Sequence, residues 1–328
     1  ETSSCLSTRG VYFQGDTIRK DFQITSYDVD APGWGCNPDT QFATNYRYPH
    51  LLGEYVWTGF DYLGEPTPFN SDNTNLLNFR TDPSKRAELE KQLAELARTQ
   101  PPSRSSYFGI VDLAGFPKDR YYLYQSHWRP DFPMAHILPH WNWAGREGQI
   151  IPVHVYTSGT EAELFVNGKS YGRKAKEEGK DFRLVWDSVV YQPGSVKVIA
   201  YKDGKEWAKD EIQTTGEAQK IQLSVDHASI IGSEDELAFV TATIVDASGR
   251  KVPTACLPLK VEVTGCGELV ATDNGDPTSF TPFQSAERES FNGLALAIVR
   301  GKKGTTGKMQ VQVSGAGLES ASIEIEVK

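Results

Sequence analysis

From residue 150 to the C-terminus, short runs of alternating apolar and polar residues follow one another, and each run ends in turn residues. A period of two places alternate side chains on one face of a strand, so these runs predict half-buried strands. Two dipeptides, Asn167-Gly168 and Asp203-Gly204, are typical of two-residue hairpin turns. This part of the chain is therefore expected to form antiparallel sheets.

The strand pattern divides into two stretches, each about the size of one β-sandwich. Residues 135–215 contain the runs IIPVHVYT, EAELFVNGKSYG, FRLVWDSVVY and SVKVIAYKDGKEWAKDEI. Residues 216–328 contain IQLSVD, LAFVTATIVD, LKVEVTG, LALAIVR, KMQVQVSG and ASIEIEVK. The polar stretch from Thr214 to Lys220 joins the two. We expect two consecutive immunoglobulin-like sandwiches.

The first 134 residues mix helical and strand signals. Helices are expected over Thr40–Arg47 and Asp82–Leu96. The segment Leu51–Phe69, LLGEYVWTGFDYLGEPTPF, begins with an apolar run. That run predicts a strand with both faces covered. The glycines and prolines that follow predict a loop, which contains aromatic and acidic residues.

This segment resembles the eighth barrel strand of the glycoside hydrolase family 2 β-galactosidases. Two further blocks, ETSSCLSTRGVY (Glu1–Tyr12) and SSYFGIVDLAGFPKDRYYLYQSHW (Ser105–Trp128), resemble the same family and stand in the expected order. The resemblance implies a mixed fold. Residues 1–134 would be the C-terminal remnant of a (β/α)8 TIM barrel, and the two sandwiches would follow.

The resemblance also implies an activity, that of a retaining exo-glycosidase. The first expectation is a β-galactosidase that hydrolyses terminal β-galactosides of simple or oligosaccharide substrates through a covalent glycosyl-enzyme intermediate. β-Glucuronidase and β-mannosidase share the fold and stay open as alternatives. A glucuronidase needs a cationic partner for the substrate carboxylate, and no basic cluster flanks the segment Leu51–Phe69.

Glu1, followed by TSSCLSTRG, matches the family's nucleophile, which precedes small residues of the Thr-Ser type. The alternative is a glutamate that stands at this position by chance. Retaining hydrolysis needs two carboxyl groups about 5 to 5.5 Å apart. The Asn-Glu pair that carries the acid/base in the family does not occur in these residues. We therefore expect a missing N-terminal part of the same enzyme as a partner, and no activity without it.

Four other residues are candidates for contact with the sugar. Trp57 is either a core residue or a flat surface on which the apolar face of a sugar stacks. Asp61 and Glu65 either accept hydrogen bonds from sugar hydroxyls or tie the loop through its backbone amides. Trp34 lies in YDVDAPGWG, whose glycines suggest a close backbone approach, and a direct contact with sugar stays open.

Composition excludes several other classes. A net charge of -9 with scattered basic residues argues against a nucleic-acid partner. No apolar run approaches the roughly 18 residues of a membrane span. Asp273–Asp276 matches only the start of a calcium loop and predicts a turn, and no metal or cofactor is expected. Cys256 and Cys266 either form a disulfide within one sandwich or remain as two buried thiols.

A competing interpretation is non-catalytic. The two sandwiches would then act as carbohydrate-binding or adhesion modules, as trailing modules of bacterial glycosidases do. Exposed edges of an incomplete barrel predict association with the missing part or self-association, so a homo-oligomer also stays open. The bacterial resemblance favours a periplasmic or secreted location over a cytoplasmic one.

Overall fold

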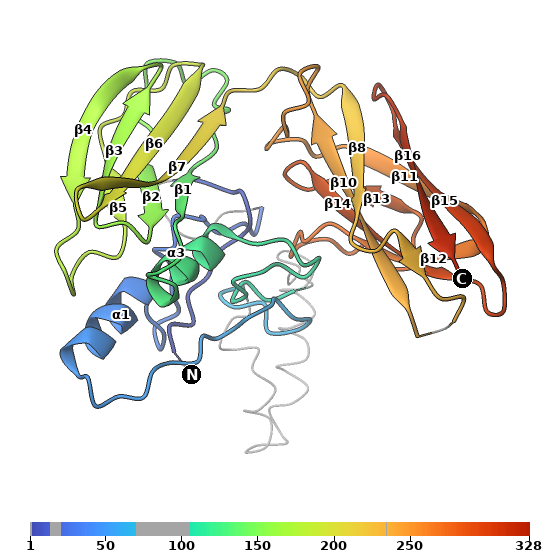
Figure 1. Ribbon diagram of the computed structural model, residues 1–328, viewed down its shortest axis with the longest axis horizontal. Helices are drawn as coiled ribbons and strands as arrows, with labels where there is room; N and C mark the ends of the chain where they lie inside the picture. Colours follow the sequence, from blue (N-terminus) through green and yellow to red (C-terminus); the bar gives the residue numbers. More distant parts are fainter. Residues whose placement is uncertain (1, 14–20, 70–104, 234) are drawn as a thin grey trace, which may run out of the picture. The chain divides into compact units, whose positions relative to one another are not determined.

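The computed structural model describes residues 2–13, 21–69, 105–233 and 235–328 (Figure 1). The chain forms two compact units. The first comprises Glu1–Tyr121 together with Glu178–Phe182 and Asp276–Phe280, and the second comprises the remaining residues.

The second unit contains two sandwiches, as the alternating pattern predicts. In the first sandwich, one sheet has the order β1-β2-β5 and the other has the order β4-β3-β6-β7. The strands are β1 (Ala135–Leu138), β2 (Val153–Thr157), β3 (Glu161–Val166), β4 (Lys169–Ala175), β5 (Leu184–Trp186), β6 (Ser195–Lys202) and β7 (Lys205–Gln213). All of their pairings are antiparallel.

The hairpin turns of this sandwich confirm the sequence prediction. Asn167 and Gly168 both have positive φ, at 50° and 78°, and so do Asp203 and Gly204, at 53° and 72°. Positive φ at both central residues is the geometry of the turns that match the twist of paired strands. The turns set the register of β3 against β4 and of β6 against β7. The apolar residues of β3 and β6 lie on the buried face.

The second sandwich also has two sheets, of orders β12-β14-β10-β8 and β13-β11-β15-β16-β9. Its strands are β8 (Lys220–Val225), β9 (Ser229–Ile230), β10 (Leu237–Val245), β11 (Pro258–Gly265), β12 (Gly267–Asp273), β13 (Glu287–Glu289), β14 (Leu294–Gly301), β15 (Gly307–Gly315) and β16 (Ala321–Val327). The sequence pattern did not predict β1, β9, β12 and β13, which lack a clear apolar alternation.

Each sandwich encloses its own apolar core. Leu164, Val198 and Trp186 belong to the first core, and Val240, Val311 and Ile325 belong to the second. Burial of one such side chain contributes about 1.5 to 3 kcal/mol before the entropy of ordering is subtracted. The two clusters therefore account for most of the driving force for folding of the second unit.

The cysteines of the second sandwich correct both alternatives that the sequence left open. Cys256 and Cys266 lie beyond opposite ends of β11 and form no disulfide. An eight-residue strand spans more than about 20 Å, so the two sulfur atoms cannot meet. The prediction of buried thiols is also wrong, because Cys256 is exposed and Cys266 is only partly buried.

The first unit contains little regular structure in its described part. Helix α1 (Pro38–Arg47) confirms the helix expected near Thr40, and the Asn37 side chain caps it by accepting a 3.1 Å hydrogen bond from the backbone N–H of Thr40. Helix α3 (Asp119–Trp128) forms the last part of the block Ser105–Trp128, called the Ser105 block below. The helix expected over Asp82–Leu96 lies outside the described residues.

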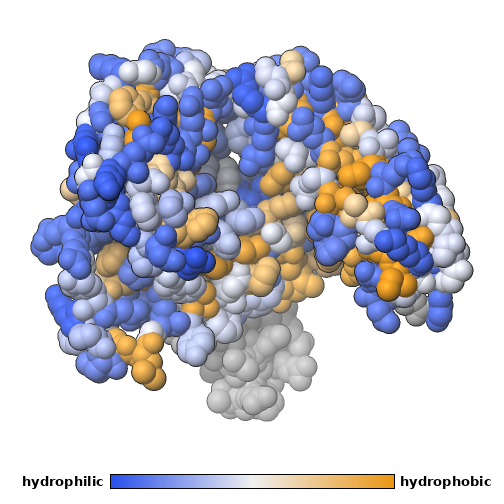
Figure 2. All heavy atoms as spheres, in the orientation of Figure 1, coloured by the Kyte–Doolittle hydropathy of each residue, from blue (hydrophilic) through white to orange (hydrophobic). Residues whose placement is uncertain are grey.

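The strand expected at Leu51–Trp57 does not form. Leu51 is 44% exposed, Leu52 is fully exposed and Tyr55 is 85% exposed. Figure 2 shows apolar side chains at the outer edge of the loop that follows α1. A strand covered on both faces needs neighbours on both sides. Within the described residues, this segment has one isolated parallel bridge, between Val56 and Thr2.

Within the described ranges, no helix is long and apolar enough to cross a membrane. The same ranges hold no group of three or more histidine, cysteine or acidic side chains arranged for a metal ion. The turn predicted at Asp273–Asp276 lies slightly later: Asp273 ends β12, residues 274–276 form a loop, and the turn is at Pro277 and Thr278. Asp273 Oδ1 accepts hydrogen bonds from the backbone N–H groups of Asn274 and Gly275, so its oxygen serves the loop backbone.

Candidate active site

The start of the chain lies beside the segment that ends at Trp57. Thr2 N donates to the carbonyl of Tyr55 at 2.9 Å, and Trp57 N donates to the carbonyl of Thr2 at 3.0 Å. The Thr2 hydroxyl also donates to Glu54 Oε2 at 2.9 Å. Glu1 itself lies outside the described residues. What the structure shows is that the residue following it pairs directly with the residues around Trp57.

Two serines that follow have an unusual backbone conformation. Ser3 and Ser4 have φ of 70° and 40°, in the left-handed region. L-residues other than glycine seldom adopt this conformation, which costs roughly 1 to 2 kcal/mol for each residue. Such strain clusters at functional sites, where the surrounding structure holds it in place. Both serines are buried.

Trp57, Tyr62 and Glu65 form a chain of hydrogen bonds. The indole Nε1–H of Trp57 donates to the hydroxyl of Tyr62 at 3.2 Å, and that hydroxyl donates to Glu65 Oε2. The rings of Trp57 and Tyr62 meet edge to face, with centroids 5.9 Å apart. Burial, reinforced by Glu65, raises the pKa of Tyr62. The phenol therefore stays protonated and acts as a donor toward the carboxylate.

Trp57 is partly buried and packs against a small apolar cluster. The buried members of the cluster are Leu6, Ile24, Tyr107 and Phe108. One part of the indole thus belongs to the core of the first unit, and the remaining part is accessible. This packing is the core role considered for Trp57, and the sugar-stacking role stays a prediction.

The loop that carries Trp34 reaches the same place. Gly35 approaches the chain start so closely that a Cβ at this position would lie 3.1 Å from the Cβ of Ser4, and Cys36 N donates to the carbonyl of Ser3 at 2.8 Å. This is the close backbone approach expected from the glycines of this loop. Trp34 is 64% exposed, and its ring lies 5.9 Å from that of Phe108.

Phe108 connects the two tryptophans. Its carbonyl accepts a 3.2 Å hydrogen bond from the backbone N–H of Thr58, the residue after Trp57. The structure therefore brings the segments of Trp34 and Trp57 to the residues that follow Glu1, and hydrogen bonds link Tyr62 and Glu65 to Trp57.

Asp61 lies beneath this surface. Its Oδ2 is 2.6 Å from the Nζ of Lys118, and its Oδ1 accepts hydrogen bonds from Gly109 N at 2.7 Å and Ser106 Oγ at 3.3 Å. The side chain is buried. Burial raises the pKa of Asp61 to about 6 against the opposing effect of Lys118, and burial lowers the pKa of Lys118. These contacts are those of a residue that ties its loop to the Ser105 block, the second of the two roles considered for Asp61.

Gly109 shows how tightly the loop and the block fit together. A Cβ at this position would overlap the backbone of Phe60, Asp61 and Val111. The neighbouring block is held by Arg120, whose Nη2 donates to the carbonyls of Phe108 and Gly109 at 2.9 and 3.0 Å. Glycine is therefore required at residue 109 for the loop after Trp57 to be seated.

A second buried ion pair lies in the same unit. Arg9 Nε is 2.5 Å from Asp112 Oδ2, and the guanidinium lies 5.1 Å from the ring centroid of Phe116. Asp112 Oδ1 also accepts a hydrogen bond from Phe116 N at 2.9 Å. Residues of the chain start and of the Ser105 block are thus held together by charge as well as by apolar packing.

Sequence reasoning missed two residues of this arrangement. Tyr62 carried a usable signal, because it stands between Trp57 and Glu65 in a loop already singled out. Lys118 carried none, because a lysine in FPKDRYY looks like any surface lysine until the fold buries it.

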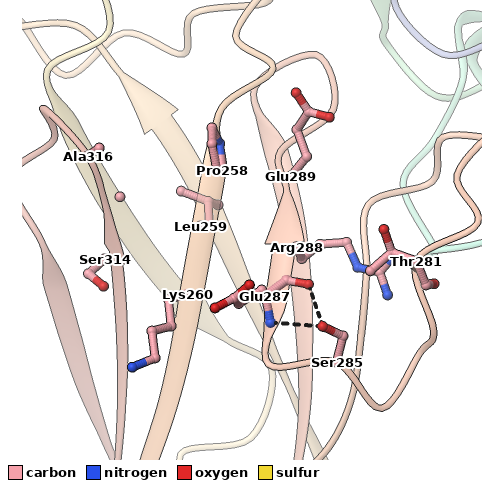
Figure 3. Close-up of a pocket in the computed structure, with 11 residues that line it drawn as sticks. Pro258, Leu259, Lys260, Thr281, Ser285, Glu287, Arg288, Glu289, Ser314 and Ala316 are labelled. Carbon is pink, nitrogen blue, oxygen red and sulfur yellow. Dashed lines mark hydrogen bonds between the residues drawn. The ribbon is translucent and has the colours of Figure 1, made fainter.

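A separate open groove of about 630 Å³ lies on the second sandwich. Figure 3 shows its lining, in which the Arg288 side chain extends toward Thr281 and the Ser285 hydroxyl contacts Glu287. Arg288 donates to the carbonyls of Thr272, Thr281 and Pro282, and Lys260 pairs with Glu262 at 2.7 Å. No aromatic side chain is among the described residues that line the groove. The hydrogen bonds of Arg288 and the ion pair of Lys260 are therefore made within the sandwich.

Two family models match the chain. The model described as glycoside hydrolase family 2 C-terminal domain 5 matches residues 221–324, within the second sandwich. A domain of unknown function (DUF4982) matches residues 148–208, within the first sandwich. The two sandwiches thus correspond to two separate, recognised domain types.

Relatives extend the similarity over the whole chain. The β-galactosidase BoGH2A of Bacteroides ovatus is 35% identical over 342 residues, which cover 100% of this chain and 36% of the relative. A β-glucuronidase of Formosa agariphila is 30% identical over 199 residues, which cover 59% of this chain and 18% of the relative. The chain thus spans about a third or less of the length of these curated relatives.

A solved structure agrees with this similarity. The crystal structure of a β-glycosidase from Bacteroides vulgatus matches with a TM-score of 0.80 and 29% identity, over 98% of this chain and 41% of that chain. A glycosyl hydrolase family 2 member from Bacteroides cellulosilyticus matches with a TM-score of 0.71 and 26% identity, over 87% of this chain and 37% of that chain. The chain belongs to glycoside hydrolase family 2, and it corresponds to the C-terminal part of the longer members of that family.

Proposed function

We propose that the first unit supplies the C-terminal end of a (β/α)8 barrel in a retaining exo-glycosidase, with Glu1 as the nucleophile. The observation that carries the proposal is the pairing of Thr2 with Tyr55 and Trp57. Parallel pairing of this kind relates neighbouring strands of a barrel, and a second isolated parallel bridge joins Phe60 to Val111. It sets the residue after Glu1 next to an aromatic side chain suited to sugar.

In this proposal, each residue has a separate role. Trp57 presents a fixed, partly accessible ring on which the C–H face of a terminal sugar stacks. Glu65 presents a carboxylate, oriented by the Tyr62 hydroxyl, that accepts hydrogen bonds from sugar hydroxyls. Trp34 belongs to a second loop that contacts the chain start, through Cys36 and Ser3. Asp61 is the positioning residue, because its pair with Lys118 seats the loop that carries Tyr62 and Glu65.

The chemistry is that of double displacement. The Glu1 carboxylate attacks the anomeric carbon and the glycosidic bond breaks as the leaving oxygen takes a proton from a second carboxyl group; water then cleaves the glycosyl-enzyme ester. No Asn-Glu pair occurs in these 328 residues, which supports an acid/base carboxyl group supplied by another part of the enzyme. The chain without the rest of the barrel is therefore inactive.

Among the sugars that the family accepts, a β-galactoside is the first choice. A relative that matches all of this chain is named as a β-galactosidase, whereas two relatives named as a β-glucuronidase and a putative β-glucuronidase match 59% and 77% of it. In the described part of the first unit, the cationic groups nearest the site are Lys118, Arg120 and Arg9, and all three are buried. None of them is exposed to pair with the carboxylate of a glucuronide.

Trapping of the covalent intermediate tests the nucleophile. The whole enzyme, incubated with a 2-deoxy-2-fluoro-β-galactosyl donor that has a good leaving group, should accumulate the galactosyl-enzyme. Peptide mapping should then find the label on the peptide that begins ETSSC. Label on a different carboxylate would overturn the role of Glu1, and efficient labelling by the glucuronic acid analogue alone would overturn the choice of sugar.

Hydrolysis of nitrophenyl β-galactoside tests the inactivity of the chain alone. The purified 328 residues should show no turnover above background, and the whole enzyme should be active. If the chain alone turns over substrate, and the Glu1→Gln variant abolishes that turnover, the proposal that it needs a second part of the barrel is wrong.

A further inference from the structure

Backbone hydrogen bonds hold the chain start against the segment around Val56. Thr2 N donates to the carbonyl of Tyr55 at 2.9 Å, and Trp57 N donates to the carbonyl of Thr2 at 3.0 Å. The two bonds make up the parallel bridge between Thr2 and Val56. Residues that lie opposite each other in such a pair place their side chains on the same face. Thr2 and Val56 therefore share a face.

Alternation of side chains then divides this segment into two faces. Counted from Val56, Glu54 lies on the face of Thr2, whereas Tyr55 and Trp57 lie on the other face. The side chains agree with this assignment, because the Thr2 hydroxyl donates to Glu54 Oε2 at 2.9 Å, which requires both groups to point to the same side. Trp57, the residue proposed to stack on the sugar, thus lies on the face opposite the bond between Thr2 and Glu54.

The carboxyl group of Glu54 is the better acceptor for the Thr2 hydroxyl. Thr2 Oγ1 also lies 3.4 Å from the carbonyl oxygen of Tyr55, a longer contact than that to Glu54. A hydroxyl has one proton to donate, and a hydrogen bond to a carboxylate is roughly twice as strong as one between neutral groups. Thr2 and Glu54 are both partly buried, so water competes for this bond only in part.

A second segment meets the chain start next to Glu54. Cys36 N donates to the carbonyl of Ser3 at 2.8 Å. Burial raises the pKa of the Cys36 thiol, a hydrogen bond with the backbone of Ser3 opposes that rise, and the charge of Glu54 adds to it. The Glu54 carboxylate therefore lies close enough to Cys36 to act on it. Glu54 stands where both neighbouring segments contact the chain start.

The backbone bonds alone do not select the face to which the chain start points. A shift by one residue preserves backbone pairing and turns every side chain to the opposite face. After such a shift, Glu1 or Ser3 would take the place of Thr2. A Glu1 carboxylate in that place would meet the carboxylate of Glu54, and like charges repel. The side chain of Glu54 thus favours the register in which Thr2 faces it.

We propose that Glu54 is a second positioning residue, which orients the nucleophile. By holding the Thr2 side chain toward itself, Glu54 commits the preceding residue, Glu1, to the opposite face, which carries Trp57. The inference rests on the proposed glycosidase function. Because Glu54 lies on the face away from Trp57, it does not touch the sugar. Its loss should slow the attack on the anomeric carbon and leave the binding of substrate unchanged.

Variants of the pair in the whole enzyme test this role. The measured quantities are the maximal rate constant for trapping by the 2-deoxy-2-fluoro-β-galactosyl donor and the donor concentration that gives half of that rate. Thr2→Val keeps the shape of the side chain and removes the hydroxyl, so the rate constant should fall about tenfold, and the half-saturating concentration should stay within about twofold. Glu54→Ala should have the same effect.

Conservative variants should recover most of the lost rate. Thr2→Ser keeps a hydroxyl donor, and Glu54→Gln keeps an oxygen acceptor. If Glu54→Ala does not fold, the comparison of Thr2→Val with Thr2→Ser decides the question by itself. An unchanged trapping rate in Thr2→Val would overturn the inference, and so would a rise in the half-saturating concentration with an unchanged rate constant.

The double variant Thr2→Val/Glu54→Ala measures whether the two groups act through their hydrogen bond. If they do, the double variant should lose no more than either single variant. Independent losses would multiply to about a hundredfold and would show that Glu54 does not act through Thr2.

The matched control is Glu163→Ala in the first sandwich. Glu163 Oε1 also accepts a hydrogen bond from a hydroxyl, that of Ser170 at 2.6 Å, and its loss should change both quantities by less than about twofold. If the unmodified enzyme forms no galactosyl-enzyme on the peptide that begins ETSSC, the proposed function itself fails. If the unmodified enzyme is labelled there and Thr2→Val is labelled equally fast, only the role of Glu54 fails.

Discussion

Asp61 and Lys118 form an ion pair with 2.6 Å between Oδ2 and Nζ, and both side chains are almost completely removed from solvent. Lys118 Nζ also donates to the carbonyl of Ser7 at 2.8 Å. This single ammonium group therefore ties together the chain start, the loop after Trp57 and the Ser105 block, three of the segments that contribute to the candidate site.

Removal of one partner of this pair should destabilise the first unit strongly. The Asp61→Asn variant leaves the Lys118 charge buried without its carboxylate, a change that costs about 3 to 5 kcal/mol in comparable pairs. Glu324→Gln is the matched control, because its pair with Lys308 is exposed and should contribute less than about 1 kcal/mol. Denaturant unfolding followed by tryptophan fluorescence measures both. Equal effects would show that Asp61 does not hold the loop.

The Asp61 carboxyl should titrate about two pH units above an ordinary aspartate. Its pKa in the folded protein is raised to about 6 by burial, above the unfolded value of about 3.9. The folded state then binds this proton more tightly than the unfolded state. The resulting stability is fully present below about pH 4 and is lost as the pH rises through 6. Carboxyl ¹³C NMR of Asp61 gives the midpoint directly, and a midpoint near 4 would contradict the burial argument.

Trp57 should matter through its ring more than through its N–H group. In the whole enzyme, Trp57→Ala removes both the sugar platform and the packing on the Leu6 cluster, so kcat/KM should fall about a hundredfold, equivalent to about 2.7 kcal/mol. Trp57→Phe keeps a flat surface and loses the hydrogen bond to Tyr62, so the loss should stay near tenfold or below.

Trp128→Ala serves as the control for this series, because Trp128 is an exposed tryptophan of the second unit and should leave kcat/KM within about threefold. Identical losses for the Ala and Phe variants of Trp57 would indicate that the hydrogen bond, and not the ring surface, carries its role.

Asp246 should protect the junction between the two sandwiches against acid. Its Oδ2 accepts from Gly216 N at 3.0 Å, and its Oδ1 accepts from the N–H groups of Ser248 and Arg250. These bonds, that from Gly216 foremost, lower its pKa to about 2. A carboxyl group with a lowered folded pKa contributes stability that is present above about pH 4 and lost as the pH falls toward 2.

Thermal unfolding of the protein and of its Asp246→Asn variant should therefore differ at pH 7, and the difference should shrink between pH 4 and pH 2. A difference that is constant over this range would mean that the carboxylate charge makes no contribution to the junction.

The sequence determined the sandwiches because their information is local. Alternation in β3, β6 and β16 puts apolar side chains on one face within a single run of residues, and the two hairpin dipeptides fix the turns without reference to the rest of the chain. The same local rule misled at Leu51–Trp57. An apolar run indicates a buried strand only if other strands cover it, and here Leu52 and Tyr55 face solvent.

Candidate site residues were predictable where they stood in one loop, as Trp57, Asp61 and Glu65 do. Their roles were decided by contacts from distant parts of the chain. Lys118 turns Asp61 into an anchor, and Tyr62 orients Glu65. Neither role follows from the spacing of residues in the sequence. A loop carboxylate that is buried against a lysine and one that is exposed to solvent can have the same sequence around them.

By itself, the sequence determined the two hairpin turns, the presence of a helix near Thr40 and the resemblance that led to the family, all of which depend on residues close together. The tertiary structure alone decided which residues meet around the chain start. Gln23 and Asp276 stand 253 residues apart, and no period or motif relates them. Such contacts form only when distant segments pack against each other. Which segments pack is decided by the fit of their shapes, by apolar burial and by charge, and the local sequence does not specify these.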